Sequence, residues 1–188
     1  MEDKYIIIAL FGGSGSGKDT LKNLAYAGIP DVHKIVRCTT RNKRENEKDG
    51  VDYNFLTPEE FAIRINNGDM LEAVSFNNWF YGTDINNLSK EGINIGAFDI
   101  FSIECLLKDS RLKVYPFEVK VSDKERLIRT LNREENPNCQ EICRRFLQDK
   151  KDFCEIPFEY QVLENDAFED MYKNREFLNH FCKTILAE

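Results

Sequence analysis

A glycine-rich loop near the N-terminus is the segment of this sequence best suited to chemistry. It reads Gly12-Gly13-Ser14-Gly15-Ser16-Gly17-Lys18-Asp19-Thr20 and follows the apolar run Tyr5–Phe11. Glycines allow successive backbone N–H groups to point inward, the lysine brings a positive charge to the β- and γ-phosphates, and a following helix adds its dipole. The order of strand, loop and helix predicts a nucleoside triphosphate site.

Asp19 departs from the usual form of such a loop. The pattern places a serine or threonine after the lysine, where its hydroxyl contacts Mg²⁺. Two interpretations of Asp19 stay open. It either binds the metal directly or through water, with help from Thr20, or it is a solvated acid that suits the helix dipole.

A basic segment further along the chain has the residues of a phosphate clamp. Arg41 and Arg44 stand three residues apart, and Tyr53 follows nine residues after the second. Guanidinium groups bind phosphate in bidentate fashion and a phenol donates one more hydrogen bond. The alternative for the same pattern is a solvated charged loop.

The surrounding motifs carry a family resemblance. Thr39-Thr40-Arg41-x-x-Arg44, Asp49-Gly50-Val51-Asp52-Tyr53-Asn54-Phe55, Met70-Leu71-Glu72 and Tyr81-Gly82-Thr83 closely resemble the GMP-binding subdomain of guanylate kinases. The resemblance extends from the loop at residue 12 to the pair Asn165-Asp166.

The resemblance implies roles for particular residues. It assigns the monophosphate to Arg41, Arg44, Tyr53 and Tyr81, although packing is an alternative role for Tyr81. It assigns the guanine edge to Glu72, with Thr83 supplying a hydroxyl. A carboxylate suits guanine because N1–H and the 2-amino group are adjacent donors.

The resemblance also implies a set of lid arginines that close over the triphosphate. They are Arg129, Arg133 and Arg145, of which the first two share a helix face because they are four residues apart. Surface solvation is the alternative, and Arg126 and Arg144 lie next to them in the sequence. Asn165 resembles an asparagine found near the adenine of ATP.

Two departures from the family concern the acceptor. Arg37 stands where guanylate kinases usually have serine, and Phe98-Asp99-Ile100-Phe101 keeps the first carboxylate of the family segment but loses the second. A deoxynucleoside monophosphate, such as dGMP or one with a modified base, is therefore a candidate substrate beside GMP. Asp99 either orders the acceptor or metal-bound water, or makes a structural hydrogen bond at a strand end. The Gly-Lys-Asp-Thr sequence is similar to phosphate loops of bacteriophage deoxynucleoside monophosphate kinases.

Composition limits the class of protein. The chain has 188 residues with 41% apolar content, enough for one buried core. Its formal charge of −7 argues against a nucleic-acid polymer as the main partner. The short N-terminal apolar run predicts neither a signal peptide nor a membrane span, so we expect a cytoplasmic protein. The cysteines lack metal-ligand spacing and are interpreted as reduced thiols. They are Cys38, Cys105, Cys139, Cys143, Cys154 and Cys182.

The hydrophobic pattern predicts alternating strands and helices. Core strands are expected at 5–11, 93–100, 112–119 and 160–163, and short β-prone pieces at 34–38, 52–55 and 71–76. Helices are expected around 20–26, at 58–67 with Thr57 as N-cap, after a Ser122/Glu125 capping box, and at the C-terminus, where the apolar spacing indicates packing alone.

These elements predict an α/β P-loop NTPase fold, a three-layer sandwich around a parallel sheet with ligands at the carboxyl ends of its strands. One domain is expected over 1–188. Its core comprises 1–33, 84–124 and 151–188, with an inserted mixed NMP-binding subdomain at 34–83 and a helical lid at 125–150.

The predicted reaction is phosphoryl transfer from ATP, with Mg²⁺, to a nucleoside monophosphate. Lys18 and the lid arginines are expected to stabilise the charge that develops, so no nucleophilic residue is needed. The alternative is a non-catalytic guanylate-kinase-like module that binds a protein partner. Such modules usually have eroded phosphate loops, whereas Gly12, Gly17 and Lys18 are all present here. We expect either a monomer or a homodimer.

Overall fold

A parallel sheet forms the centre of the molecule in a computed structural model that describes residues 4–76, 78–133 and 135–187. In the described residues its strand order is β2-β7-β1-β8-β9, and every neighbouring pair runs parallel. The strands are β1 (Tyr5–Phe11), β2 (Val32–Lys34), β7 (Ile93–Ala97), β8 (Leu112–Lys120) and β9 (Gln161–Glu164).

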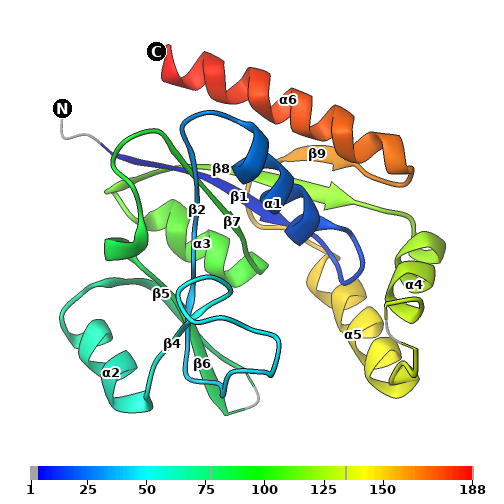
Figure 1. The fold of residues 1–188 in the computed structure, drawn as a ribbon, viewed down its shortest axis with the longest axis horizontal. Coiled ribbons are helices and arrows are strands. Elements are labelled where there is room, and N and C mark those ends of the chain that lie inside the picture. Colours follow the sequence, from blue (N-terminus) through cyan, green and yellow to red (C-terminus); the bar gives the residue numbers. More distant parts are fainter. Residues whose placement is uncertain (1–3, 77, 134, 188) are drawn as a thin grey trace.

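Helices cover both faces of this sheet, as Figure 1 shows. Ile8 and Leu10 of the central strand face a core shared with α1 (Lys18–Gly28) and α6 (Phe168–Leu186). The alternate residues of the strand face a second core that includes α3 (Ile100–Lys108). A strand buried on both faces reads as a continuous apolar run. The predicted three-layer α/β architecture is confirmed.

A smaller mixed sheet lies beside the first, in the order β4-β3-β6-β5. Its strands are β3 (Cys38–Thr39), β4 (Asn54–Phe55), β5 (Met70–Phe76) and β6 (Trp79–Asp84), and a 3₁₀ turn at Ile85–Asn87 follows. α2 (Pro58–Asn66) packs on it and begins with the predicted N-cap. There the hydroxyl of Thr57 accepts from the backbone N–H of Glu60, and the Glu60 carboxylate accepts from that of Thr57.

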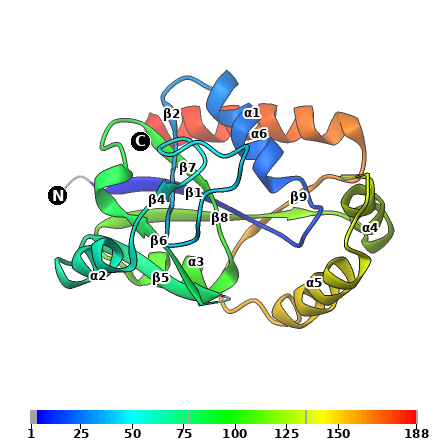
Figure 2. The same cartoon turned by 60° about the horizontal axis from the view of Figure 1, so that its bottom comes forward.

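Two further helices, α4 (Asp123–Leu131) and α5 (Cys139–Asp152), pack against each other. They lie on the opposite side of the molecule from α2 (Figures 1 and 2). The helix predicted after Ser122 is present and begins at Asp123, but it has only 9 residues, and the predicted Ser122/Glu125 capping box does not form. The backbone N–H of Ser122 donates instead to Asp166 at 2.9 Å, and the Glu125 carboxylate binds Arg129 at 2.8 Å.

Several predicted boundaries also need correction. The strand expected over 93–100 ends at Ala97, because Asp99 caps α3, a helix that the sequence pattern did not predict. The piece expected at 34–38 is divided between β2 and β3, which belong to different sheets. The first helix begins at Lys18 rather than near Thr20.

The six cysteines are free thiols, as the sequence predicted. Among the described residues, no helix has the length and apolar character needed to cross a bilayer.

Candidate nucleotide site

The glycine-rich loop joins β1 directly to α1. At two of its positions the backbone conformation or the space available requires glycine. Gly15 and Gly17 have φ of 81° and 86°, in the left-handed region that side chains disfavour. A Cβ on Gly15 would lie 2.5 Å from the Arg126 carbonyl oxygen of α4. The loop therefore takes its shape only with glycine at these points, and it packs closely against α4.

Three contacts from distant parts of the chain hold the loop. The buried Asn165 donates from Nδ2 to the Ser16 carbonyl at 2.7 Å. Arg126 donates from Nε to the Ser14 carbonyl at 3.0 Å. The backbone N–H of Ser14 donates to the Asp149 carboxylate at 2.7 Å, and Asp149 in turn pairs with Arg126. A carboxylate on a loop N–H indicates that this loop suits an oxygen anion.

Lys18 and Asp19 open the helix that follows. Burial lowers the pKa of Lys18, against the attraction of the Asp19 and Asp149 carboxylates. Asp19 is exposed, and its Oδ1 lies 2.8 Å from the ammonium of Lys22. The protein around Asp19 removes part of the solvent near its carboxylate, which opposes ionisation, but the charge and hydrogen bond of Lys22 outweigh this and lower its pKa. Asp19 is therefore an ionised carboxylate beside the phosphate loop.

A cavity of about 510 Å³ opens in front of the loop. Lys18 and Asp19 line it, together with the three predicted lid arginines. The structure thus brings Arg129, Arg133 and Arg145 to one cavity. In the described residues Arg129 also donates to the Asp166 carbonyl at 2.7 Å, and Arg145 shares the Glu141 carboxylate with Arg144.

The predicted monophosphate clamp lies on the smaller sheet and the loop between β3 and β4. Both terminal nitrogens of Arg41 donate to the Glu47 carboxylate at 2.8 Å, and the backbone N–H of Arg44 donates to it at 2.9 Å. The Arg41 guanidinium lies 5.5 Å from the ring centre of Tyr53, whose ring is 6.1 Å from that of Tyr81. Arg41 and the two phenols therefore belong to one neighbourhood, in which Glu47 is paired with Arg41, and Arg44 joins it through its backbone N–H.

The predicted base-binding residues form a second cluster, built around a buried carboxylate. Glu72 accepts from Arg37 at 2.8 Å, from the Thr83 hydroxyl at 2.7 Å and from the Ser102 hydroxyl at 3.1 Å. Asp99 caps α3 by accepting from the Ser102 backbone N–H at 2.8 Å. It also lies 3.9 Å from Arg37. Asp99 therefore makes a structural hydrogen bond after the strand end, which is one of the two roles predicted for it.

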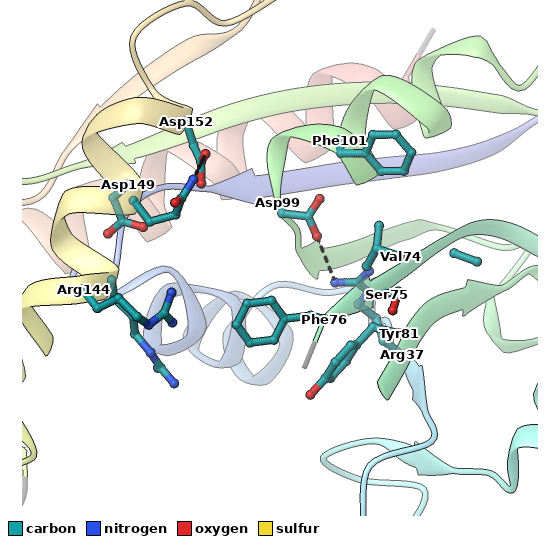
Figure 3. Close-up of a pocket in the computed structure, with 13 residues that line it drawn as sticks. Arg37, Val74, Ser75, Phe76, Tyr81, Asp99, Phe101, Arg144, Asp149 and Asp152 are labelled. Atoms are coloured by element: carbon teal, nitrogen blue, oxygen red, sulfur yellow. Dashed lines mark hydrogen bonds and ion pairs between the residues drawn. The ribbon is translucent and has the colours of Figure 1, made fainter. Parts of the chain in front are cut away.

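Cavities connect the clusters. One of about 750 Å³ is lined by Arg37, Tyr81 and Asp99 on one side and by Arg144 of α5 on the other, as Figure 3 shows. Arg145 of α5 also lines it. Another of about 600 Å³ shares Arg37 and Asp99 with it and reaches Lys18. The phosphate loop and the base-binding cluster thus border one continuous cleft.

The sequence pattern did not identify Asp149 or Ser102 as parts of the site. Arg126 was noted only as a neighbour of the lid arginines. Each acts through a partner far along the chain: Ser14 is 135 residues from Asp149 and Glu72 is 30 residues from Ser102. The acidic pair Asp149 and Asp152, on the helix that carries Arg145, was the sequence feature that could have indicated Asp149 as part of the site.

The described residues contain no group of three histidine, cysteine or carboxylate side chains arranged to hold a metal ion. The exposed Asp19 carboxylate is a hard oxygen ligand of the kind Mg²⁺ takes when it is bound through one carboxylate and the phosphates of a nucleotide. The donor set therefore fits a metal that enters with the nucleotide.

Comparison with known proteins gives one consistent result. The guanylate kinase family profile matches residues 3–180. Guanylate kinase of Helicobacter pylori is 30% identical over 99% of this chain and 90% of its own length. Guanylate kinase of Salinibacter ruber is 29% identical over 95% and 100%. The crystal structure of guanylate kinase from Anaplasma phagocytophilum superposes with a TM-score of 0.66 at 20% identity, over 97% of this chain and 86% of that one.

Proposed function

The chain belongs to the guanylate kinase family, and from that premise we propose that it transfers the γ-phosphoryl group of ATP to GMP or dGMP, producing ADP and the nucleoside diphosphate. The observation that carries the proposal is the continuous cleft. It joins Lys18 and the phosphate loop to the neighbourhood of Arg37, Tyr53 and Asp99. A kinase needs two nucleotide sites that open toward each other.

The donor half is the phosphate loop. We assign the triphosphate to the backbone N–H groups of the loop and to Lys18, and the closure over it to Arg129, Arg133 and Arg145. The loop N–H of Ser14 already binds an oxygen anion, the Asp149 carboxylate, which supports this assignment. Mg²⁺, when bound with ATP, neutralises charge on the phosphates, and Asp19 is the residue we assign to hold it.

The acceptor half is the clamp with the base-binding cluster. We assign the monophosphate to Arg41, Arg44, Tyr53 and Tyr81, whose neighbourhood is described above. Arg41 exchanges its Glu47 partner for phosphate oxygens, which suit the same bidentate geometry. The base lies toward Arg37, Glu72 and Thr83.

Catalysis under this proposal is alignment and charge neutralisation. The acceptor phosphate is already an anion, so no side chain has to be a nucleophile or to remove a proton. Lys18 and the lid arginines stabilise the charge that spreads over the transferring group. The segments 34–83 and 125–150 act as the NMP-binding subdomain and the lid, and their closure excludes water that would otherwise hydrolyse ATP.

An ADP-release assay with Mg-ATP and a panel of acceptors tests the proposal. GMP and dGMP are expected to stimulate ADP formation above dTMP, dUMP and dCMP. Lys18→Ala is expected to abolish turnover while the protein stays folded by circular dichroism. If no nucleoside monophosphate stimulates ADP formation, the protein is not a kinase of this class. Activity retained in Lys18→Ala would refute the assignment of the phosphate loop.

A further inference from the structure

Arg37 closes the acceptor carboxylate off from the cleft. Its Nη2 donates to Glu72 at 2.8 Å and to the Ser102 hydroxyl at 3.2 Å. The Glu72 side chain has no exposed surface, and the Thr83 hydroxyl donates to the same oxygen as Arg37. The Ser102 hydroxyl lies 3.1 Å from the other oxygen and 2.9 Å from the Asp99 carboxylate. A carboxylate in this position is covered by protein groups on the side of the cleft. It has no free face for the N1–H and 2-amino donors of guanine.

Arg37 has N–H donors that its contacts with Glu72 and Ser102 do not use. A guanidinium has five N–H donors, and Nη2 uses its two on Glu72 and Ser102. Nε is buried without an acceptor among the residues that the structure describes. Nη1 lies 3.9 Å from the exposed Asp99 carboxylate, too far for a hydrogen bond. Of the three remaining donors, those on Nη1 are on the side of Asp99, at the cleft (Figure 3).

The wall around Arg37 suits a flat base. The guanidinium lies 5.3 Å from the centre of the Phe98 ring, which fixes its plane. Phe76 and Phe101 line the same cavity and are 47% and 55% exposed, so much of each side chain is accessible to a ligand. A cavity of about 750 Å³ is in the range that holds a nucleotide-sized ligand. Aromatic rings and the two N–H donors of Nη1 together select a base with acceptors on its edge.

We propose that Arg37 is a specificity-determining residue of this protein, which reads the O6/N7 acceptor edge of a 6-oxopurine in place of the donor edge that a free carboxylate would read. The inference rests on the proposed function, because it concerns the acceptor of that reaction. Arginine pairs with O6 and N7 of guanine in many complexes. Hypoxanthine has the same two acceptors and lacks only the 2-amino group. Adenine places an amino donor where O6 would be. GMP and IMP should therefore bind alike, and AMP should be rejected.

Calorimetric titration of the intact protein with GMP, IMP and AMP tests this directly. We expect the dissociation constants of GMP and IMP to differ by less than about tenfold, and AMP to bind at least about tenfold more weakly than either. A site that reads the 2-amino group through a carboxylate would reject IMP by about a hundredfold or more, because an acceptor would be left unpaired. A GMP preference of tenfold or more over IMP overturns the inference.

The variants Arg37→Ser and Arg37→Lys sharpen the test. Arg37→Ser uncovers Glu72 and should raise the IMP-to-GMP ratio of dissociation constants by at least about tenfold. Arg37→Lys keeps the charge beside Glu72, but its single nitrogen cannot hold Glu72 and also face the base as Nη2 and Nη1 do, so it should weaken GMP and IMP equally. If Arg37→Ser raises this ratio of dissociation constants by less than about tenfold, the inference is overturned. If that variant does not fold, the wild-type ratio and Arg37→Lys decide the question.

The binding readout separates this inference from the proposed function. If GMP and IMP bind alike but no ADP forms with any acceptor, the kinase assignment fails and the role of Arg37 stands. If ADP forms but GMP is strongly preferred, the kinase assignment stands and the role of Arg37 fails. If none of the three monophosphates binds, both fail.

Discussion

Asp149 of α5 accepts a 2.7 Å hydrogen bond from the backbone N–H of Ser14, in the middle of the phosphate loop. The same carboxylate pairs with Arg126, which also binds the Ser14 carbonyl. One carboxylate and one guanidinium thus connect both backbone polar groups of Ser14 to helices α5 and α4. A nucleotide phosphate that approaches this N–H meets a negative charge already bound there.

Asp149→Asn is therefore expected to tighten ATP binding. The amide oxygen can still accept from Ser14, but the negative charge that competes with phosphate is gone. We expect the dissociation constant of ATP to fall by about three- to tenfold, and the free energy of unfolding to fall by about 1–3 kcal/mol because Arg126 loses its ionic partner. Calorimetry and urea denaturation measure the two effects.

Asp152→Asn is the matched control for this prediction. Asp152 lines the same cleft from the same helix, but its carboxylate accepts from Gln148 and not from the loop. Its removal changes the charge equally and should alter ATP affinity much less. Equal tightening in both variants would mean that general charge, and not the contact with Ser14, controls the affinity.

The role of Asp19 is tested through Mg²⁺. As a metal ligand next to Lys18, it should be replaceable by serine, whose hydroxyl restores the usual loop pattern. We expect Asp19→Ser to stay within about tenfold of the wild type in kcat, and Asp19→Ala to need about 10- to 100-fold more Mg²⁺ for half-maximal tightening of ATP binding. Titration of ATP with and without Mg²⁺ gives this quantity independently of turnover.

Lys22→Ala controls for the ion pair that Asp19 makes. It removes the 2.8 Å contact and leaves the Asp19 carboxylate in place. The Mg²⁺ requirement should not rise in this variant. If Asp19→Ala binds Mg-ATP as the wild type does, Asp19 is a solvated first-turn acid and not a ligand.

The parts of the fold that could be predicted depend on contiguous residues. Strand, glycines and lysine of the phosphate loop all lie within the fourteen positions from Tyr5 to Lys18, and the capping box of Thr57 and Glu60 spans four residues. The similar pattern at Ser122 failed. A carboxylate 44 residues away, on Asp166, takes the N–H that the box would have used. A local pattern predicts a local contact only where no distant partner competes for it.

The site shows the same division. The residues of the loop, clamp and lid could be named from their spacing and from the family resemblance. What they contact could not, because the partners of Ser14, Arg37 and Glu72 are set by how helices α3 and α5 dock on the sheets. Arg37 was visible as a departure from the family, but the sequence contains no sign that it would cover Glu72.

Glu47 gives a prediction for the dependence of stability on pH. The hydrogen bonds from Arg41 lower its pKa from 4.5 to about 2, against the opposing effect of burial, and the backbone N–H of Arg44 adds to the lowering. A carboxyl whose pKa is lower in the folded state stabilises the fold above its unfolded pKa, and this contribution is lost as the pH falls toward the folded pKa. The stabilisation by Glu47 should therefore be complete above about pH 5 and disappear toward pH 2.

Comparison of the wild type with Glu47→Gln measures this contribution. The difference in the free energy of unfolding should be constant between pH 6 and 7 and should be smaller at pH 3, in urea denaturation at each pH. Glu45→Gln removes the same charge from an exposed position of the same loop and serves as the control. A difference for Glu47→Gln that grows as the pH falls would contradict the assigned ion pair with Arg41.

Replacement of Asn165 distinguishes two roles for its side chain: holding the phosphate loop in place and contacting adenine. Its Nδ2 donates to the buried Ser16 carbonyl at 2.7 Å, so Asn165→Ala should leave that carbonyl unpaired. We expect a loss of about 1–3 kcal/mol in the free energy of unfolding and about tenfold weaker ATP binding, because the loop is no longer held in place. GTP binding should weaken by the same factor, since the loop serves the phosphates of either nucleotide.

Asn174→Ala is the matched control for this last prediction. Asn174 is also buried, and its Nδ2 donates at 2.9 Å to a backbone carbonyl, that of Glu164, but it does not contact the phosphate loop. Its replacement should cost a similar amount of stability and leave ATP affinity unchanged. If Asn165→Ala weakens ATP but not GTP, Asn165 contacts the base, and the resemblance that placed it near adenine is the better guide. Equal weakening of both nucleotides, with none in Asn174→Ala, assigns Asn165 to the loop, because only a displaced phosphate cradle affects both nucleotides alike.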